Sequence, residues 1–501
     1  MKTLFLVCFV LLSPFLLSRT LEVGTGRPFA TVQAAAAQAA PGDTILVRAG
    51  VYGGGEYIEN LQGSPSAWIT LLAAPGESVI YRGGSQAFHF VDAAYLRIAG
   101  FVFEGQTGNG VNMDDGGSYA TPAHSIHIED CQWRAMNATG NNDQLKLSGV
   151  DTLRVSRCSF SNGSAGGSAI DMVGCHYANF EECAFTNGGS NSIQAKGGSQ
   201  YIRIARNRFV DAGERALNIG GSTGAAFFRP LNANFEASDV AVFSNVFTGS
   251  MSPIAYVGAV RCAVMNNTIY RPGKWAIRIL QETVGPNYLP CGENIFANNI
   301  VVVTNAAANP TINIGSNTAP ATFLFSNNLW YNEQNTSWSG PNLPVSETAG
   351  ILNRNPLLAD PANGDFAIPL SSPATGKGMT TVEPTVDFLG RAFASTRSIG
   401  AVEGNPGTTS ISPAGRPASP SLHIWPNPSL DGRFMIRLDA LERGPVALTI
   451  VNSLGRIVHQ ETHLNHQQEF LGIRSDLPSG MYSVLLMSAR GVLRQSVCIV
   501  R

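Results

Sequence analysis

Lysine, aspartate, amide and arginine side chains recur at the centre of one short apolar pattern. The pattern reads Leu-Lys-Leu at 145–147, Ile-Asp-Met at 170–172, Ile-Gln-Ala at 193–195, Leu-Asn-Ile at 217–219 and Ile-Arg-Ile at 277–279. If the apolar residues point inward, the central polar ones point out together. Cations beside amides and a carboxylate suit an extended acidic glycan, because Arg and Lys neutralise uronate carboxylates while amides bond to hydroxyl groups.

Lys196, two residues beyond Gln194, is the candidate for a catalytic base. β-Elimination next to a uronate carboxylate needs a base that takes the C5 proton. A lysine whose pKa is lowered by a nearby cation or by partial desolvation can serve. We therefore predict Lys196 as the base, next to Lys146 and Arg278. Arg278 is predicted to neutralise the substrate carboxylate, and Asp171 to orient a lysine or to help bind a cation.

Six further polar residues are predicted to bind the glycan around these four catalytic ones. Two of them, Gln194 and Asn218, belong to the repeated pattern itself. The others lie on adjoining turns or on insertions between the repeats. The set is Gln194, Asn218, Glu214, Arg215, Arg229 and Glu282.

Three other interpretations of this polar set remain open. Outward charges are often only a solvated face. A glycoside hydrolase needs two carboxylates about 5–10 Å apart, and Asp171 with Glu214 is the one pair to try. A non-catalytic, surface-displayed carbohydrate-binding or adhesive solenoid is also compatible with the sequence.

No cofactor is required by the sequence. Calcium is possible, although Asp114, Asp115 and Asp143 are spread out along the chain.

The elements that must position these residues repeat at a nearly fixed interval. The apolar residue that opens each pattern recurs every 23–25 residues, or every 35–37 where an insertion intervenes, at Leu145, Ile170, Ile193, Leu217, Ile254, Ile277 and Ile312. Period-2 alternation predicts strands with one buried face, and a fixed repeat predicts a solenoid. Insertions at residues 222–238, 281–291 and 331–350 should wall a groove, and residues 105–124 read as a loop.

A second pattern precedes the first in each repeat. A Cys or Asn anchor is followed two residues later by an aromatic or aliphatic residue. The anchors are Cys131, Cys158, Cys183, Asn207, Asn245, Asn267, Asn299 and Asn328. Like residues at one position should stack into ladders, and a buried Asn ladder satisfies its amides along the stack.

These repeats resemble those of the right-handed parallel β-helix proteins of the pectin-lyase-like superfamily, over roughly residues 21–400. The resemblance implies an all-β solenoid with an N-terminal cap helix, here within the Ala-rich residues 29–40. It also implies a carbohydrate-active protein. Related lyases use a Lys or Arg base, sometimes with calcium, so a polysaccharide lyase with a polysaccharide substrate is the leading expectation.

The chain ends predict export. Lys2 followed by an apolar run indicates a signal peptide over residues 1–19, followed by the β-helix domain over 20–401 and a Gly/Pro/Ser-rich linker over 402–420. Residues 421–501 read as a small β-sandwich. Their Pro-Asn-Pro at 426–428, Gly480 with Tyr482 and basic last residue resemble the type IX secretion sorting domain. That implies the secretion machinery as partner, and release or surface attachment beyond the outer membrane.

Composition narrows the remaining possibilities. The 501 residues carry a net charge of −2, which gives no global field to attract nucleic acid. No second long apolar run is present, so the mature chain should lack a transmembrane segment, and we expect a monomer. Cys262 and Cys291 flank one repeat and are either a disulfide or two buried thiols.

Overall fold

The computed structural model describes residues 18–381 and 383–404. Beyond residue 420 it describes residues 421–425, 429, 433–439, 444–452, 457–466, 470–474, 477–478, 480–488 and 491–499. The predicted signal peptide therefore lies outside the described residues up to position 17, and the predicted linker lies outside them from position 405.

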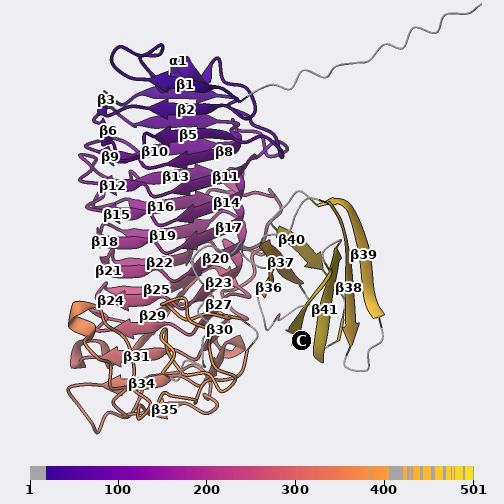
Figure 1. Ribbon diagram of the computed structural model, residues 1–501. Helices are drawn as coiled ribbons and strands as arrows, with labels where there is room; N and C mark the ends of the chain where they lie inside the picture. The colour runs from indigo at the N-terminus through magenta and orange to yellow at the C-terminus, as the bar shows by residue number, and fades with distance from the viewer. Residues whose placement is uncertain are drawn as a thin grey trace, which may run out of the picture.

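Residues 20–352 wind into a parallel β-helix, in which each coil adds one strand to each of three long sheets (Figure 1). Sheet A contains 13 strands. They are β1 (Thr20–Val23), β2 (Thr44–Val47), β5 (Ile69–Ala73), β8 (Ala94–Ala99), β11 (Ala123–Glu129), β14 (Val150–Ser156), β17 (His176–Glu181), β20 (Ser199–Ala205), β23 (Ala237–Phe243), β26 (Ala259–Val260), β27 (Ala263–Met265), β30 (Ile295–Ala297) and β33 (Leu324–Ser326).

Sheet B follows sheet A in each coil and contains 12 strands. They are β3 (Gly50–Gly53), β6 (Val79–Arg82), β9 (Val102–Glu104), β12 (Gln132–Arg134), β15 (Ser159–Ser161), β18 (Ala184–Gly188), β21 (Arg208–Ala212), β24 (Val246–Thr248), β28 (Thr268–Tyr270), β31 (Ile300–Val303), β34 (Leu329–Asn332) and β35 (Ile351–Leu352).

Sheet C closes each coil and contains 10 strands. They are β4 (Glu56–Glu59), β7 (Phe88–Val91), β10 (Val111–Asp114), β13 (Leu145–Ser148), β16 (Ser168–Val173), β19 (Asn191–Lys196), β22 (Arg215–Gly220), β25 (Ser252–Val257), β29 (Ile277–Leu280) and β32 (Ile312–Ile314). The strands that carry the predicted site are therefore neighbours in this one sheet.

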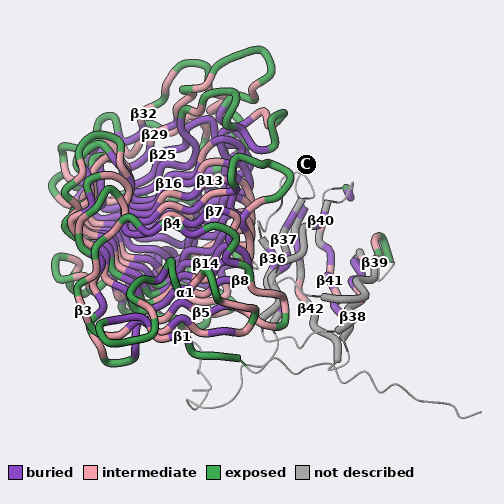
Figure 2. Tube along the Cα trace, turned by 90° about the horizontal axis from the view of Figure 1, so that it is seen from above, coloured by how far each residue is buried: buried purple, intermediate pink, exposed green. Residues whose placement is uncertain are grey.

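Side-chain ladders fill the interior, as the repeats predict. Buried segments run along the sheets, and exposed segments lie at the turns (Figure 2). Six aromatic rings stack with centroids 4.7–5.1 Å apart, from Phe103 through Trp133, Phe160, Phe185 and Phe209 to Phe247. These spacings match the strand spacing of about 4.8 Å, so the rings follow the coil stack.

The anchor residues form a second ladder beside the rings. From Asn207 to Asn328 each amide nitrogen donates to the amide oxygen of the next anchor at 3.0–3.1 Å. Each of these nitrogens also donates to a main-chain carbonyl, so the buried amides are paired. The ladder ends on Glu347, which accepts from the Asn328 amide at 2.7 Å. Burial raises the pKa of Glu347.

A residue with positive φ precedes every anchor and turns the chain from sheet A into sheet B. These residues are Asp130, Arg157, Glu182, Arg206, Ser244, Asn266, Asn298 and Asn327. Their φ values of 52–58° place them in the left-handed region, where the chain can make a tight corner. The corner recurs at the same place in each coil and so keeps the strands in register.

The cap helix is shorter than the Ala-rich run suggests. Helix α1 (Val32–Ala36) is capped by the Thr31 hydroxyl and buries Val32 and Ala35. The short helices η1 (Ala225–Phe227), η2 (Asn305–Ala307), η3 (Pro320–Thr322) and η4 (Pro361–Asn363) lie in the later turns and insertions. The loop predicted over residues 105–124 is wrong in part, because apolar Val111 and Met113 alternate there and form β10.

Cys262 and Cys291 are free, buried thiols, so the disulfide alternative is wrong. The closing segment, residues 351–400, follows the last full coil. Its residues Phe366, Ile368 and Ile399 pack with residues of sheet B such as Val246 and Ile300. The closing segment therefore covers sheet B, whereas the predicted site lies on sheet C.

The last part of the chain forms two antiparallel sheets with a core of their own. One contains β36 (Ser421–Trp425), β37 (Arg433–Asp439) and β40 (Phe470–Arg474). The other contains β38 (Gly444–Asn452), β39 (Ile457–His466), β41 (Gly480–Ser488) and β42 (Gly491–Ile499). This agrees with the small C-terminal β-domain predicted from the sequence.

Candidate active site on the outer face of sheet C

The register of sheet C brings the predicted central residues into one line. Lys146 pairs with Asp171, Asp171 with Gln194, and Gln194 with Asn218. The line continues through Ala255 to Arg278 and Asn313. Lys146 and Arg278, which are 132 positions apart in sequence, thus share one outward row.

Asp171 lies between two lysines. Its Oδ2 contacts the Lys146 ammonium, and its Oδ1 lies 3.3 Å from Lys196 Nζ. The Lys196 ammonium also donates to Gln194 Oε1 at 3.3 Å. The Asp171 side chain is 1% exposed, against 22% for Lys146 and 15% for Lys196. The carboxylate therefore forms the floor of this cluster and the two ammonium groups reach toward its surface.

Asp143 is a second buried carboxylate in the cluster and was not predicted as a site residue. Its Oδ2 lies 3.5 Å from Lys146 Nζ, and its Oδ1 accepts from the Ser168 amide at 2.8 Å. Burial, together with the neighbouring Asp171, raises the pKa of Asp143. Burial lowers the pKa of Lys146, but the Asp171 and Asp143 carboxylates outweigh it and leave that pKa raised. Lys146 is therefore held as a cation.

Arg278 heads a second cluster on the same face. Its Nε donates to Asn313 Oδ1 at 3.1 Å, and its guanidinium lies 4.8 Å from the Trp275 ring centroid. Burial and then the nearby Arg215 lower the pKa of Arg278. Arg215 donates to Asn218 Oδ1 at 3.1 Å and pairs with Glu282 at 3.0 Å.

Lys196 on β19 and Arg278 on β29 are three strand spacings apart, whereas Arg215 lies on β22, the strand next to β19. At a strand spacing of about 4.8 Å, the strand of Lys196 and the strand of Arg278 are about 14 Å apart. Arg278 is thus on the predicted face but is not a direct neighbour of Lys196. Asn218 lies between Lys196 and Arg278 in the row. It is 2% exposed, so it lies at the bottom of the site and not at its surface.

A buried carboxylate, Glu236, holds the wall beside Lys196. It accepts from the Gly197 amide at 2.8 Å and from the Thr223 amide and hydroxyl at 2.9 and 2.7 Å. It also accepts from the Thr283 hydroxyl. One side chain thereby ties the insertions 222–238 and 281–291 to the turn that follows Lys196.

Arg229 has a different environment from the other predicted residues. Its guanidinium grips both oxygens of Asp151 at 2.7 Å and donates to Gly174 O at 2.9 Å. It is buried and holds the insertion 222–238 to the turn after β16. We therefore leave Arg229 out of the substrate-contacting set proposed below.

Glu214 is exposed at the start of β22, four residues before Asn218. On an ideal sheet its Cα lies about 16 Å from that of Asp171, given four residue steps along the strand and two strand spacings across. Hydrolases place their carboxyl groups about 5–10 Å apart. This geometry gives the Asp171–Glu214 pair no support.

Sequence reasoning missed a polar cluster that extends the row in the other direction. His89 pairs with Tyr57 on one side and with Asn112 on the other, and Asn112 pairs with Lys146. His89 Nε2 lies 2.6 Å from Asp114 Oδ2, which also accepts from the Asn112 amide at 3.1 Å. The alternation Phe-His-Phe at 88–90 was the available signal, but the loop expected at 105–124 hid β10.

Within the described residues, no group of three or more His, Cys, Asp or Glu side chains is placed to hold a metal ion. No helix among the described residues is long and apolar enough to cross a membrane.

Comparison with known families identifies the end of the chain. Residues 423–500 match the family model of the secretion system C-terminal sorting domain. This confirms the predicted sorting domain, and with it the expectation that the protein is exported by that system. No curated protein sequence matches the chain.

Comparison with solved structures confirms the fold. Pectate lyase Pel9A aligns with a TM-score of 0.52 and 13% identity, over 77% of this chain and 97% of that one. The complex of XylC with xylose aligns at 0.46 and 11%, over 77% and 98%, and a rhamnogalacturonan lyase at 0.42 and 13%, over 66% and 90%. At such identity the likeness to Pel9A shows the fold alone, which is the predicted right-handed parallel β-helix.

Proposed function

We propose that this protein is a polysaccharide lyase that cleaves a uronate-containing glycan by β-elimination on the outer face of sheet C. The observation that carries the proposal is the buried Asp171 carboxylate between the Lys146 and Lys196 ammonium groups. Two lysines on one buried carboxylate can supply both things that elimination needs. One ammonium group neutralises the substrate carboxylate, and the other lysine, as the neutral amine, takes the proton.

The two lysines differ in what they can do. Lys146 contacts Asp171 and lies near Asp143, and its raised pKa keeps it charged. It therefore suits the stabilisation of the negative charge that develops on the uronate carboxylate. Lys196 has one carboxylate oxygen at 3.3 Å and one amide oxygen at 3.3 Å. It is the residue we assign as base.

The bonds in the proposed step balance without a further reactant. The Lys196 amine takes the C5 proton, and the electron pair of that C–H bond becomes the C4–C5 double bond. The C4–O bond breaks, and the departing glycosidic oxygen takes up a proton from the Lys196 ammonium or from water, so that no proton is gained or lost overall. The products are a new reducing end and an unsaturated uronate.

The Arg cluster would bind another part of the same polymer. Arg278 lies along the row, and its strand is about 14 Å from that of Lys196 by strand spacing. Arg215 lies on β22, the strand next to that of Lys196. Their forked guanidiniums suit a second uronate carboxylate. Asp171, Gln194 and Asn218 would act as positioning residues, because each is bonded to a cation that it orients.

We propose that the protein's own cations do the work that calcium does in some lyases. Lys146, Lys196, Arg215 and Arg278 supply positive charge along the row. A calcium ion that bridges the substrate to Asp143 or Asp171 is the alternative. EDTA is expected to leave the rate within about twofold, and a loss restored by added calcium would favour the alternative.

The sorting domain at residues 423–500 implies that the secretion machinery is a partner. We propose that the β-helix acts outside the cell, either released or attached to the surface, where polymeric glycans are accessible. Fractionation of a host that carries the secretion system would separate the two destinations.

The test is the rate at which unsaturated uronate absorbance appears during incubation with pectate or alginate. Lys196→Ala is expected to lose at least about 100-fold in kcat, the scale of general-base catalysis, while still binding the polymer. Lys377→Ala, an exposed lysine in the closing segment, is the matched control and should keep the wild-type rate. An unchanged rate in Lys196→Ala would remove the assigned base. Binding without product would favour the adhesive solenoid.

A further inference from the structure

We propose that a pocket at the corner between sheets C and A binds a neutral sugar unit, separately from the row that carries Lys196. The pocket has a volume of about 520 Å³. Ten residues line it, among them Asn60, Gln62, Asp92, Tyr95 and His124. Its shape and lining combine aromatic walls with a few polar groups, as small-ligand sites do.

Two successive coils supply the polar side of the pocket. Asn60 follows β4 and Asp92 follows β7, each with φ of 54°. Asn and Asp tolerate this left-handed conformation better than most residues do. The repeat therefore presents an amide and a carboxylate at equivalent turns, one strand spacing of about 4.8 Å apart along the axis.

Asp92 places a carboxylate in the lining of the pocket. Its Oδ1 is buried and finds no hydrogen-bond partner among the described residues. Gln62 Nε2 donates to the Asp92 main-chain oxygen at 2.9 Å, which holds that turn against the pocket. A buried carboxylate oxygen that lacks a donor costs free energy, and a sugar hydroxyl is a donor of the right kind.

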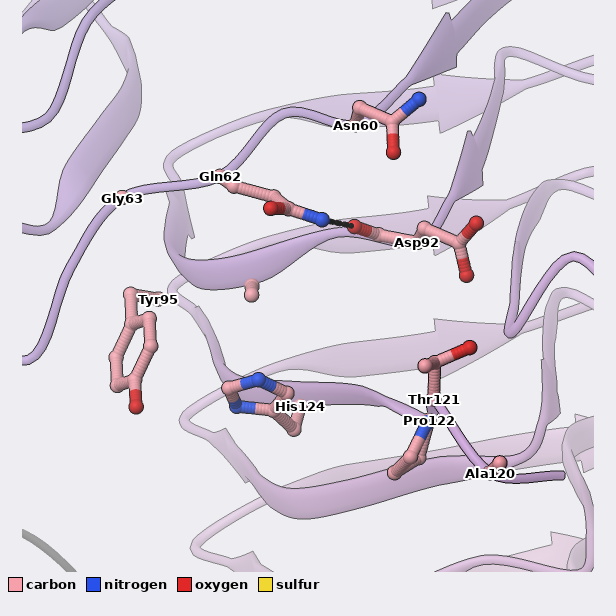
Figure 3. A pocket seen from close by; sticks show the side chains of 10 residues that line it. Asn60, Gln62, Gly63, Asp92, Tyr95, Ala120, Thr121, Pro122 and His124 are labelled. Carbon is pink, nitrogen blue, oxygen red and sulfur yellow. Dashed lines mark hydrogen bonds between the residues drawn. The ribbon is translucent and has the colours of Figure 1, made fainter. Parts of the chain in front are cut away.

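Aromatic rings supply the opposite side. Figure 3 shows Tyr95 across the pocket from Asp92, with His124 between them. The Tyr95 and His124 rings meet edge to face with centroids 4.9 Å apart, and Trp68 packs against Tyr95 at 5.8 Å. The C–H face of a pyranose is apolar and packs well on such rings. Burial lowers the pKa of His124, so its ring is neutral near pH 7.

The charge of the pocket selects the class of sugar. None of the ten lining residues is Lys or Arg, and the one formal charge is the Asp92 carboxylate. A uronate would meet a like charge with no cation to offset it. A neutral sugar would instead donate hydroxyls to Asp92 and accept from Asn60. The pocket thus suits a neutral unit, whereas the row on sheet C suits an acidic one.

This second site goes beyond the proposed lyase activity and does not depend on it. The strands β7 and β19 are four spacings apart, so the pocket and the Lys196 cluster are about 19 Å apart along the axis. A neutral-sugar site at that distance would suit a polysaccharide that mixes neutral and acidic units.

The experiment is calorimetric titration of the full chain with cellohexaose, xylohexaose, mannohexaose and trigalacturonate. At least one neutral hexasaccharide is expected to bind at about 1 mM or tighter. Tyr95→Ala and Asp92→Ala should each weaken that binding at least tenfold, while Tyr95→Phe and Lys196→Ala keep it. Circular dichroism melting of each variant establishes that it folds.

Three results would overturn the proposal. They are no binding by any neutral hexasaccharide, unchanged binding in a folded Tyr95→Ala variant, and Tyr95-dependent binding of trigalacturonate alone. Neutral-sugar binding that persists while no uronate polymer is cleaved would leave this site in place and remove the lyase proposal.

Discussion

Asp171 is the residue on which the proposed chemistry depends most. It is almost completely buried and serves two lysines at once, so its loss would leave two ammonium groups without their shared partner. The sequence could place Lys146, Asp171 and Gln194 in one line because their flanking apolar residues fix the register. It could not show that Asp143 joins them, because Asp143 lies outside the repeated triplet and reaches the cluster through its side chain.

Asp171→Asn is expected to lower both stability and activity. Breaking a buried ion pair costs about 3 kcal/mol, which a urea midpoint shift would report. The kcat should also fall by about tenfold or more, because a lysine that loses its positioning partner is misplaced. Asp365→Asn, at an exposed turn, is the control. A stability loss with an unchanged kcat would make Asp171 a purely structural residue.

At the scale of the elements, the Asn ladder is the part of the fold that the sequence predicts best. Its anchors stand at one position of the repeat, and buried amides are satisfied only if the coils stack in register. The 222–238 and 281–291 insertions were predicted as walls. Their common attachment to Glu236 was not, because it joins Thr223 and Thr283 through contacts that no repeat encodes.

Asn267→Ala should destabilise the coil stack more than Cys183→Ala does. Asn267 Oδ1 accepts from the main-chain and side-chain N–H groups of Asn245, and its amide donates to Asn299 Oδ1. Its removal leaves the buried Asn245 donors without this acceptor and takes one donor from Asn299. We expect about 3 kcal/mol for Asn267→Ala, from unsatisfied buried groups, and about 1 kcal/mol for Cys183→Ala. Chemical denaturation followed by circular dichroism measures both. Equal losses would mean that the ladder contributes only volume.

Glu236→Ala should loosen the wall beside Lys196 without removing any group that touches substrate. We expect faster hydrogen exchange over residues 222–230 and 281–289, and a fall of about tenfold in kcat, because misplaced groups lose rate. Glu104→Ala removes a surface carboxylate that pairs with Arg82 and Arg134 on sheet B, and should change neither measurement. Unchanged exchange in Glu236→Ala would contradict the assigned tie.

At the scale of the whole molecule, stability should depend on pH through the imidazole of His127. Burial, and then the nearby Arg154, lower the pKa of His127 to about 4 from the ordinary value of 6.5. Between these values the unfolded chain binds a proton that the folded chain does not. The stability from His127 is therefore complete above pH 6.5 and is lost as the pH falls toward 4, by up to about 3 kcal/mol.

His127→Phe keeps a ring to pack on Trp68, whose centroid lies 4.5 Å from that of His127, and removes the titration. The melting temperature of the wild type should fall more than that of His127→Phe between pH 7 and pH 4.5. Parallel curves for the two proteins would show that His127 does not titrate in this way.

The solenoid as a whole could be predicted because each coil repeats the same alternation of apolar residues, which buries one face of each strand. The site was predictable only where it follows that repeat. Arg229, on an insertion, pairs with Asp151 instead of joining the row. Tyr57, His89 and Asn112 belong to the row but precede the clearest repeats.

The measurement that tests the central claim most directly is the mass of the oligosaccharides that the protein releases from a uronate polymer. Elimination predicts fragments whose non-reducing end is lighter by one water molecule than the product of hydrolysis, and predicts that Lys196→Ala releases almost none. Fragments that have gained water, or equal release by wild type and Lys196→Ala, would contradict the assignment of a lysine-based lyase to sheet C.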